Sequence, residues 1–303
     1  MTQPIHRNAQ AHRVNGAPMS AQPLEAGAAL PQLLQPRPSG TRRWKERMRI
    51  RATIPKGVYV LLSVCGFLLP LITWQLVASS GWVGSLFLPS PADVVQSFAD
   101  WLRSGLSGDT FISIYRVVMG FCIAAIIGVP LGLYIGAYKW FEALLQPIND
   151  FVRYMPASAF IPLVLLWVGI GEGSKIAIIF IGVIFQVIVM VADAVRRVPE
   201  NYLEVAYTMG ATQGEVLGLV VWRGILPELL DILRINMGWA WTYLVVAEMV
   251  AANSGLGFQI LQSQRFLNTP KIFVGIFVIG LIGLLFDLAF RWAYRLAFPW
   301  KRA

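Results

Sequence analysis

The sequence predicts an all-α integral membrane protein with about six spans and both termini in the cytoplasm. The composition is 56% apolar and 14% charged, and 303 residues cannot bury that much apolar surface in soluble cores of ordinary proportions. Two uncharged runs, residues 58–92 and 117–138, each exceed the roughly 20 residues that cross about 30 Å of hydrocarbon. A soluble α/β enzyme would instead show apolar runs of strand or short-helix length.

Residues 1–55 differ from the rest of the chain. They are rich in Pro, Gln, Ala and Gly, lack the short apolar core of a secretory signal, and end in a basic cluster from Arg42 to Arg51. We expect a disordered, basic cytoplasmic tail. A basic cluster can bind nucleic acid, but one directly before a span is more typical of a positive-inside signal attracted to anionic lipid headgroups. Residues 56–303 are then expected to form the transmembrane domain.

The order of the spans fixes the expected topology. The six spans are predicted at about residues 58–78, 111–137, 157–171, 176–192, 229–252 and 272–293. Counting from a cytoplasmic N-terminus places the polar segment 193–227 in the cytoplasm, in agreement with Arg196 and Arg197. The net charge of +9 then reflects topology more than an acidic ligand.

Small residues inside the predicted spans are expected to serve helix packing. Gly128, Gly132 and Gly136 lie four apart on one helical face, where small residues let a second helix approach closely. Cys65 and Cys122 both lie within apolar runs, so no disulfide framework is expected.

The sequence contains no arrangement typical of an active site. There is no phosphate-binding G-x-x-x-x-G-K-[ST] motif, no His or Cys cluster with metal-ligand spacing, and no nucleophile elbow. The two histidines, His6 and His12, lie in the N-terminal tail. We therefore expect a non-catalytic channel or transport subunit without a metal site, driven by another chain or by an ion gradient.

The polar segment 193–227 carries a recognisable motif. Glu204, Val205 and Ala206 are followed at fixed spacing by Gly210, and the segment resembles the EAA loop of the permease subunits of bacterial ABC importers, E-A-A-x3-G-x9-I-x-L-P. Trp222-Arg223 stands where that motif has Leu-Pro, whereas Leu226-Pro227 follows four residues later. A Leu-Pro at this later position resembles the motif of the family branch that transports nitrate, sulfonates, taurine and bicarbonate.

Further blocks extend the resemblance over nearly all of the chain after residue 55. They are residues 88–98, 116–121, 128–137, 156–175 and 245–260. The resemblance implies a type I ABC importer transmembrane domain in the bacterial inner membrane, forming the path for a small anion that a periplasmic binding protein delivers. It also implies a second permease subunit, as a homodimer, and two cytoplasmic ATPase subunits that bind ATP and Mg²⁺, so no cofactor is expected in this chain.

The resemblance implies an ATPase-coupling role for five residues of the loop. In the family this segment forms short cytoplasmic helices, bent at the glycine, that dock in a groove of the ATPase subunit. The coupling residues are then Glu204, Val205, Ala206, Gly210 and Ala211. Gly210 suits the bend because glycine accepts backbone angles barred to other residues. The alternative is an ordinary solvated helix with a C-terminal glycine.

Polar residues at membrane depth are the candidates for the translocation path, since they are costly unless they face water or protein. The candidates are Asn236, Trp239, Thr242, Tyr243 and Glu248 in the fifth span, with Gln186 and Ser158 as weaker ones. For Glu248 a structural role is an equally good interpretation, in which its carboxylate is the partner of a helix end or of a neighbouring arginine.

The nature of the transported solute stays open at this point. Arg116, Arg153 and Arg234 are the cations nearest the spans, and none of them decides which anion is carried. The competing function is a secondary transporter or channel subunit that needs no ATPase, which would favour inverted repeats and interrupted spans around an ion site.

Overall fold

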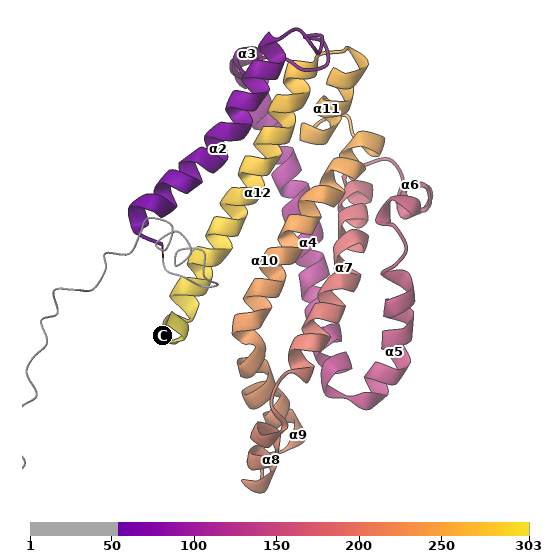
Figure 1. The fold of residues 1–303 in the computed structure, drawn as a ribbon. Helices are drawn as coiled ribbons and strands as arrows, with labels where there is room; N and C mark the ends of the chain where they lie inside the picture. Colours follow the sequence, from indigo (N-terminus) through magenta and orange to yellow (C-terminus); the bar gives the residue numbers. More distant parts are fainter. Residues whose placement is uncertain (1–53, 303) are drawn as a thin grey trace, which may run out of the picture. The chain divides into compact units, whose positions relative to one another are not determined.

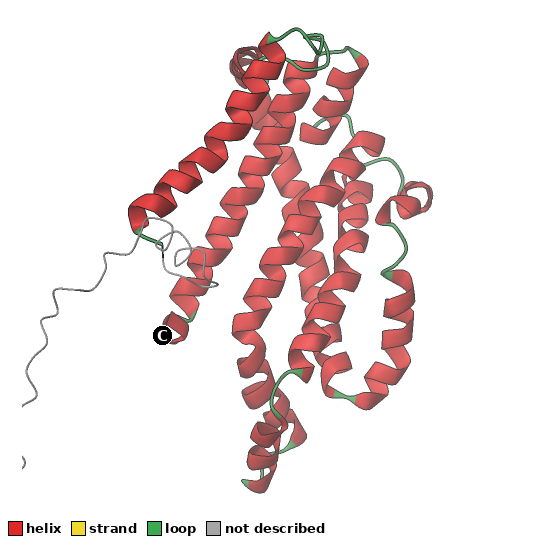
Figure 2. Cartoon of the chain, viewed as in Figure 1, coloured by secondary structure: helices red, strands yellow, loops and turns green. Residues whose placement is uncertain are grey.

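The computed structural model describes residues 54–302, and within that range every regular element is a helix (Figure 2), which confirms the all-α fold class. The longer helices are α2 (Lys56–Ser79), α3 (Pro91–Ser104), α4 (Leu106–Ala137), α5 (Lys139–Val152), α7 (Glu172–Arg196), α10 (Trp222–Ala251), α11 (Leu256–Arg265) and α12 (Thr269–Ala297). The short ones are η2 (Ala157–Phe160), α6 (Ile161–Val168), α8 (Glu200–Thr208), α9 (Gln213–Glu215), the π-helical η3 (Val216–Val221) and η4 (Pro299–Arg302). All but the last two residues of the predicted tail lie outside the described residues.

The chain divides into two compact units, residues 1–63 and 64–303. The described part of the first unit consists of residues 54–63, which include the start of α2, where the Ser63 hydroxyl donates back to the Tyr59 carbonyl at 2.9 Å. The second unit contains the remainder of α2 and all the other helices named above.

Four of the described helices are long and apolar enough to cross a membrane, namely α2, α4, α7 and α12, and α5 with η2 and α6 makes a fifth if that bent pair is one span. Helix α10 has 30 residues, or about 45 Å of helix. It does not join the four, because polar residues such as Asn236, Thr242 and Glu248 lie within it. The sixth span, through α10, stays a prediction.

The third expected span differs from the straight crossing predicted over residues 157–171. The structure has α5 followed by a bend of 88° into residues 157–168, and α6 itself is eight residues long. Pro156 disfavours a helical backbone at Met155, and Gly169, at φ 83°, lies just after the end of α6. A broken helix at membrane depth is tolerated where the freed backbone is covered by protein or lines a cavity.

Helix α7 packs along α4 and along α10 (Figure 1). Glycines of α4 make the first contact close: a Cβ added at Gly132 would lie 2.7 Å from the Ile188 carbonyl oxygen, and one at Gly136 would lie 2.7 Å from that of Ala192. Gly128 faces Val187 in the same way. The predicted packing role of these glycines is therefore confirmed.

The departure from the motif at Trp222-Arg223 has a structural counterpart. The π-helical turn η3 runs directly into α10, so Trp222 begins the long helix instead of ending a short one. Pro227 lies inside α10, where its missing N–H leaves one helical hydrogen bond unmade. The polar segment and the fifth expected span are thus continuous.

Candidate functional site

The segment predicted to couple to an ATPase forms two short helices separated by a tight turn. Helix α8 ends in a Schellman motif: the Ala211 N–H donates to the Ala206 carbonyl at 3.0 Å, and the Gly210 N–H donates to the Tyr207 carbonyl at 2.9 Å. Gly210 has a φ of 86°, the left-handed region in which other residues are strained. Glycine therefore closes α8 and turns the chain toward the next helix.

A capping box starts the second helix of this turn. The Thr212 N–H and hydroxyl both donate to the Glu215 carboxylate at 2.8 Å, and the Glu215 N–H donates to the Thr212 hydroxyl at 3.4 Å. The backbone and then the side-chain hydrogen bond from Thr212 hold the pKa of Glu215 below its usual value. The stabilisation from this capping box is therefore fully present above the ordinary pKa of glutamate. It is lost as the pH falls through the lowered pKa of Glu215.

Helix α8 has no buried residue within the chain. Glu204 and Val205 are exposed, as is Met209 just beyond the helix, while Ala206 and Ala211 are half-buried. Apolar side chains gathered on one exposed helix are typical of an interaction surface. The geometry thus leaves the predicted coupling residues available to a partner.

Ion pairs tie the base of this segment to three helices. Arg196, at the end of α7, pairs with Asp193 at 3.1 Å and with Glu142 of α5 at 3.3 Å. Arg197 pairs with Glu228 of α10. The stretch between α7 and α8 is therefore held to α5, α7 and α10 by charged contacts.

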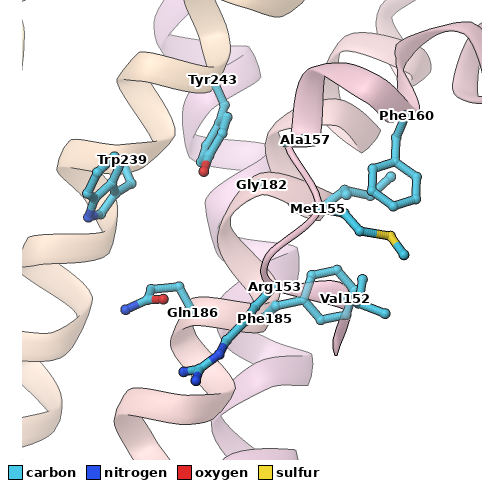
Figure 3. Close-up of a pocket in the computed structure, with 11 residues that line it drawn as sticks. Val152, Arg153, Met155, Ala157, Phe160, Gly182, Phe185, Gln186, Trp239 and Tyr243 are labelled. Atoms are coloured by element: carbon cyan, nitrogen blue, oxygen red, sulfur yellow. The ribbon is translucent and has the colours of Figure 1, made fainter. Parts of the chain in front are cut away.

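Three of the path candidates meet at a cavity of about 180 Å³ at the bend after α5 (Figure 3). Gln186 reaches it from α7, and Trp239 and Tyr243 reach it from α10. The remaining lining residues are Val152, Arg153, Met155, Ala157, Phe160, Ile181, Gly182 and Phe185. No sequence pattern predicted this cavity as a whole, because its walls come from segments far apart in the chain.

The other candidates in the helices lie elsewhere. Asn236 is fully buried, and its amide donates to the Ile232 carbonyl at 2.9 Å while its oxygen has no partner among the described residues. Thr242 and Ser158 are exposed and do not line the cavity, although Ser158 follows the lining residue Ala157. These three stay unassigned candidates.

Glu248 belongs to a buried ionic network between helices. Its Oε1 accepts from Arg116 Nη1 at 2.6 Å and from the Ser113 hydroxyl at 2.7 Å, and both Glu248 and Arg116 are completely buried. Arg116 also donates twice to Glu172 of α7, at 2.6 and 2.8 Å. Lys175 donates to the same carboxylate at 2.7 Å. The network joins α4, α7 and α10.

The loop after α10 closes over this network. The Gly257 N–H, in the first turn of α11, donates to Glu248 Oε2 at 2.7 Å, and the Leu256 N–H donates to the Ser113 hydroxyl at 2.9 Å. A Cβ at Gly255, where φ is 108°, would overlap the Glu248 carboxylate. Glu248 therefore partners both a helix end and an arginine, as the structural alternative predicts.

Comparison with known proteins identifies the family. Residues 128–302, more than half of the chain, match the model of the binding-protein-dependent transport system inner membrane component. The chain belongs to this family. It is thus the multi-pass inner-membrane permease of a binding-protein-dependent transport system.

Relatives match the permease over most of their length. It is 32% identical to the taurine transport system permease protein TauC of Escherichia coli (strain K12), over 83% of this chain and 94% of that protein. It is 34% identical to the putative aliphatic sulfonates transport permease protein SsuC of Bacillus subtilis (strain 168), over 78% and 88%. It is 31% identical to the bicarbonate transport system permease protein CmpB of Synechococcus elongatus, over 86% and 94%.

A solved structure supports the fold of the permease. A chain of the inward-facing MetNI methionine ABC transporter superposes with a TM-score of 0.60 at 18% identity, over 64% of this permease and 97% of that chain. At this identity the likeness concerns the fold alone. It confirms the ABC importer permease fold expected from the sequence.

Proposed function

We propose that this permease forms the translocation path of an ATP-driven importer for small oxyanions. One observation carries the proposal: over nearly their whole length, relatives at 31–34% identity are named as permeases for taurine, aliphatic sulfonates and bicarbonate. These solutes differ in their organic part and share a small anionic group with oxygen acceptors. Nitrate belongs to the same chemical class.

The proposed assembly contains two copies of the permease, two cytoplasmic ATPase subunits and a periplasmic binding protein that delivers the solute. ATP and Mg²⁺ are bound by the ATPase subunits, and the permease itself catalyses no reaction. Six spans with both termini in the cytoplasm put the 193–227 segment on the ATPase side. The exposed face of α8 and the closed turn at Gly210 support docking there.

Coupling would follow from the connections of α8. Closure of the ATPase dimer moves α8, and the ion pairs of Arg196 and Arg197 carry the motion to α5, α7 and α10. The same three helices contribute walls of the cavity that Gln186, Trp239 and Tyr243 line. Alternating access in this proposal is a reorientation of these helices around that cavity.

Uptake into proteoliposomes tests the proposal. The permease is reconstituted with its ATPase subunits and cognate binding protein, and uptake of labelled taurine, an alkanesulfonate, nitrate and bicarbonate is measured with and without ATP. We expect ATP-dependent uptake of at least one of the four. Equal uptake without ATP or without the ATPase subunits would support the secondary transporter instead, and no uptake of any of the four would contradict the solute class.

A further inference from the structure

We propose that the cavity at the bend after α5 is an oxyanion-binding site in which the Arg153 guanidinium holds the anionic group. The inference rests on the proposed function and names the residues that would recognise its solute. Arg153 directly follows α5, at the start of the break between α5 and η2. Among the described residues that line the cavity, it is the only charged one.

The hydrogen bonds of Arg153 are incomplete. Its Nε is buried without a hydrogen-bond partner among the described residues, although it forms an ion pair with Asp150 Oδ1 at 3.4 Å. One terminal nitrogen donates to the Tyr154 hydroxyl at 3.1 Å, and the guanidinium lies 4.9 Å from the centre of that ring. Because a buried unpaired donor is unfavourable, an oxygen acceptor supplied by a ligand is favoured here. A guanidinium fork matches the oxygens of a sulfonate or carboxylate.

The other two arginines close to the spans each pair with two carboxylates, whereas Arg153 pairs with Asp150 alone among the described residues. Arg116 is held by Glu172 and Glu248, and Arg234 by Asp231 and Asp287. Neither arginine lines this cavity. Arg153 thus combines a cavity position with a buried Nε–H that has no hydrogen-bond acceptor among the described residues.

Neutral polar groups complete the site. Gln186, Trp239 and Tyr243 line the same cavity, and their side chains make no hydrogen bond to another described residue. Figure 3 shows Trp239 and Tyr243 on α10, across from Arg153, with Gln186 of α7 between them. An amide, an indole N–H and a phenol are donors that can bind anion oxygens.

The apolar part of the wall fits a short carbon chain. Met155, Phe160, Ile181 and Phe185 also line the cavity. Its volume of about 180 Å³ is several times the space that one water molecule needs. A Cβ added at Gly182 would overlap the ring of Tyr243, so the missing side chain sets how closely that ring packs on α7. The site therefore suits a small oxyanion with or without a short alkyl group.

Charge-selective labelling of a cysteine in the cavity tests this proposal. In the assembled complex, Cys65 and Cys122, both exposed, are changed to Ser, and Gln186→Cys is introduced. Its modification rates are measured with two methanethiosulfonate reagents, one carrying a sulfonate and one a trimethylammonium group, each normalised to its rate with free cysteine. The same measurement is made after adding Arg153→Gln, Arg153→Lys, or the control Arg103→Gln, which removes an arginine charge outside the cavity lining.

We expect the anionic-to-cationic rate ratio to fall about tenfold on Arg153→Gln, because an adjacent positive charge attracts one reagent and repels the other. Arg153→Lys should keep most of the ratio, and Arg103→Gln should leave it unchanged. Excess taurine should slow modification by an uncharged reagent in the parent and not in Arg153→Gln. If Gln186→Cys does not assemble, Met155→Cys serves, since Met155 lines the same cavity.

An unchanged ratio in Arg153→Gln would overturn the inference. The labelling needs no transport, so it is separable from the proposed function. If Arg153→Gln lowered the rate ratio but no ATP-driven uptake were found, the importer function would be contradicted and the anion site would still be supported. If uptake were ATP-driven but Arg153→Gln left the rate ratio unchanged, only the anion-site proposal would be contradicted.

Discussion

Glu248 and Arg116 are completely buried and lie 2.6 Å apart, with Glu172 as a second carboxylate partner of the arginine. From the sequence alone, Glu248 is a costly polar residue at membrane depth, and Arg116 is one of three cations near the spans. The sequence could not pair them, because the two residues are separated by 132 positions and meet only through helix packing. The accompanying donors, Ser113 and the Gly257 N–H, gave no chemical signal of their own.

Replacing Glu248 by Gln should strongly destabilise the permease. The variant removes one carboxylate from a buried arginine, and breaking a buried ion pair costs about 3–5 kcal/mol. We expect a lower unfolding temperature in detergent and less assembled complex. The double variant Arg116→Met with Glu248→Leu should recover part of this loss, because no unpaired buried charge remains. Wild-type stability of Glu248→Gln would show that the pair is not structural.

Gly255→Ala tests how tightly the loop closes on the same network. The substitution combines strain at φ 108° with overlap of the Glu248 carboxylate. Backbone strain of this kind is about 1–3 kcal/mol, and the overlap adds to it. Gly105→Ala is the matched control, since Gly105 has a φ of 128° and open space around it. Gly255→Ala should lower the unfolding temperature clearly more than Gly105→Ala does. Equal decreases for the two variants would contradict the close contact between Gly255 and Glu248.

At the scale of helices, periodicity and composition predicted the apolar spans and the α4 glycine face. The bend between α5 and α6 was not predicted, because the apolar run of residues 157–171 reads the same whether the helix is straight or broken. Its geometry depends on Pro156 and Gly169 together with the neighbours around the cavity. The alternative of a solvated helix with a terminal glycine describes the backbone of α8 correctly, and the docking role stays a prediction.

Gly132→Leu should separate α4 from α7. The added side chain would enter space that the Ile188 carbonyl and Val191 occupy, and overpacking of a core costs typically about 1–3 kcal/mol. Gly108→Leu is the control, since Gly108 lies in the same helix with open space around it. We expect Gly132→Leu to reduce the thermal stability and the yield of assembled complex, and Gly108→Leu to leave both unchanged. Comparable stability of both variants would contradict the close packing.

For the whole chain, the sequence and the comparisons agree on an inner-membrane permease, while the structure adds how its parts connect. The segment from α8 to η3 continues into α10, and ion pairs join its base to α5 and α7. These helices also contribute to the cavity wall. In the proposed mechanism, a motion of α8 would reach the cavity through these continuous helices and charged contacts.

The role of the α8 turn is tested most directly by Gly210→Val and Gly214→Val, compared in the reconstituted complex. Both glycines have open space around them, and only Gly210 has a positive φ, so valine strains the turn at 210 and not at 214. We expect Gly210→Val to insert and assemble normally but to lose ATP-dependent uptake and solute-stimulated ATPase activity, while Gly214→Val keeps both. If the Gly210→Val complex kept wild-type levels of uptake and of solute-stimulated ATPase activity, coupling through this turn would be contradicted.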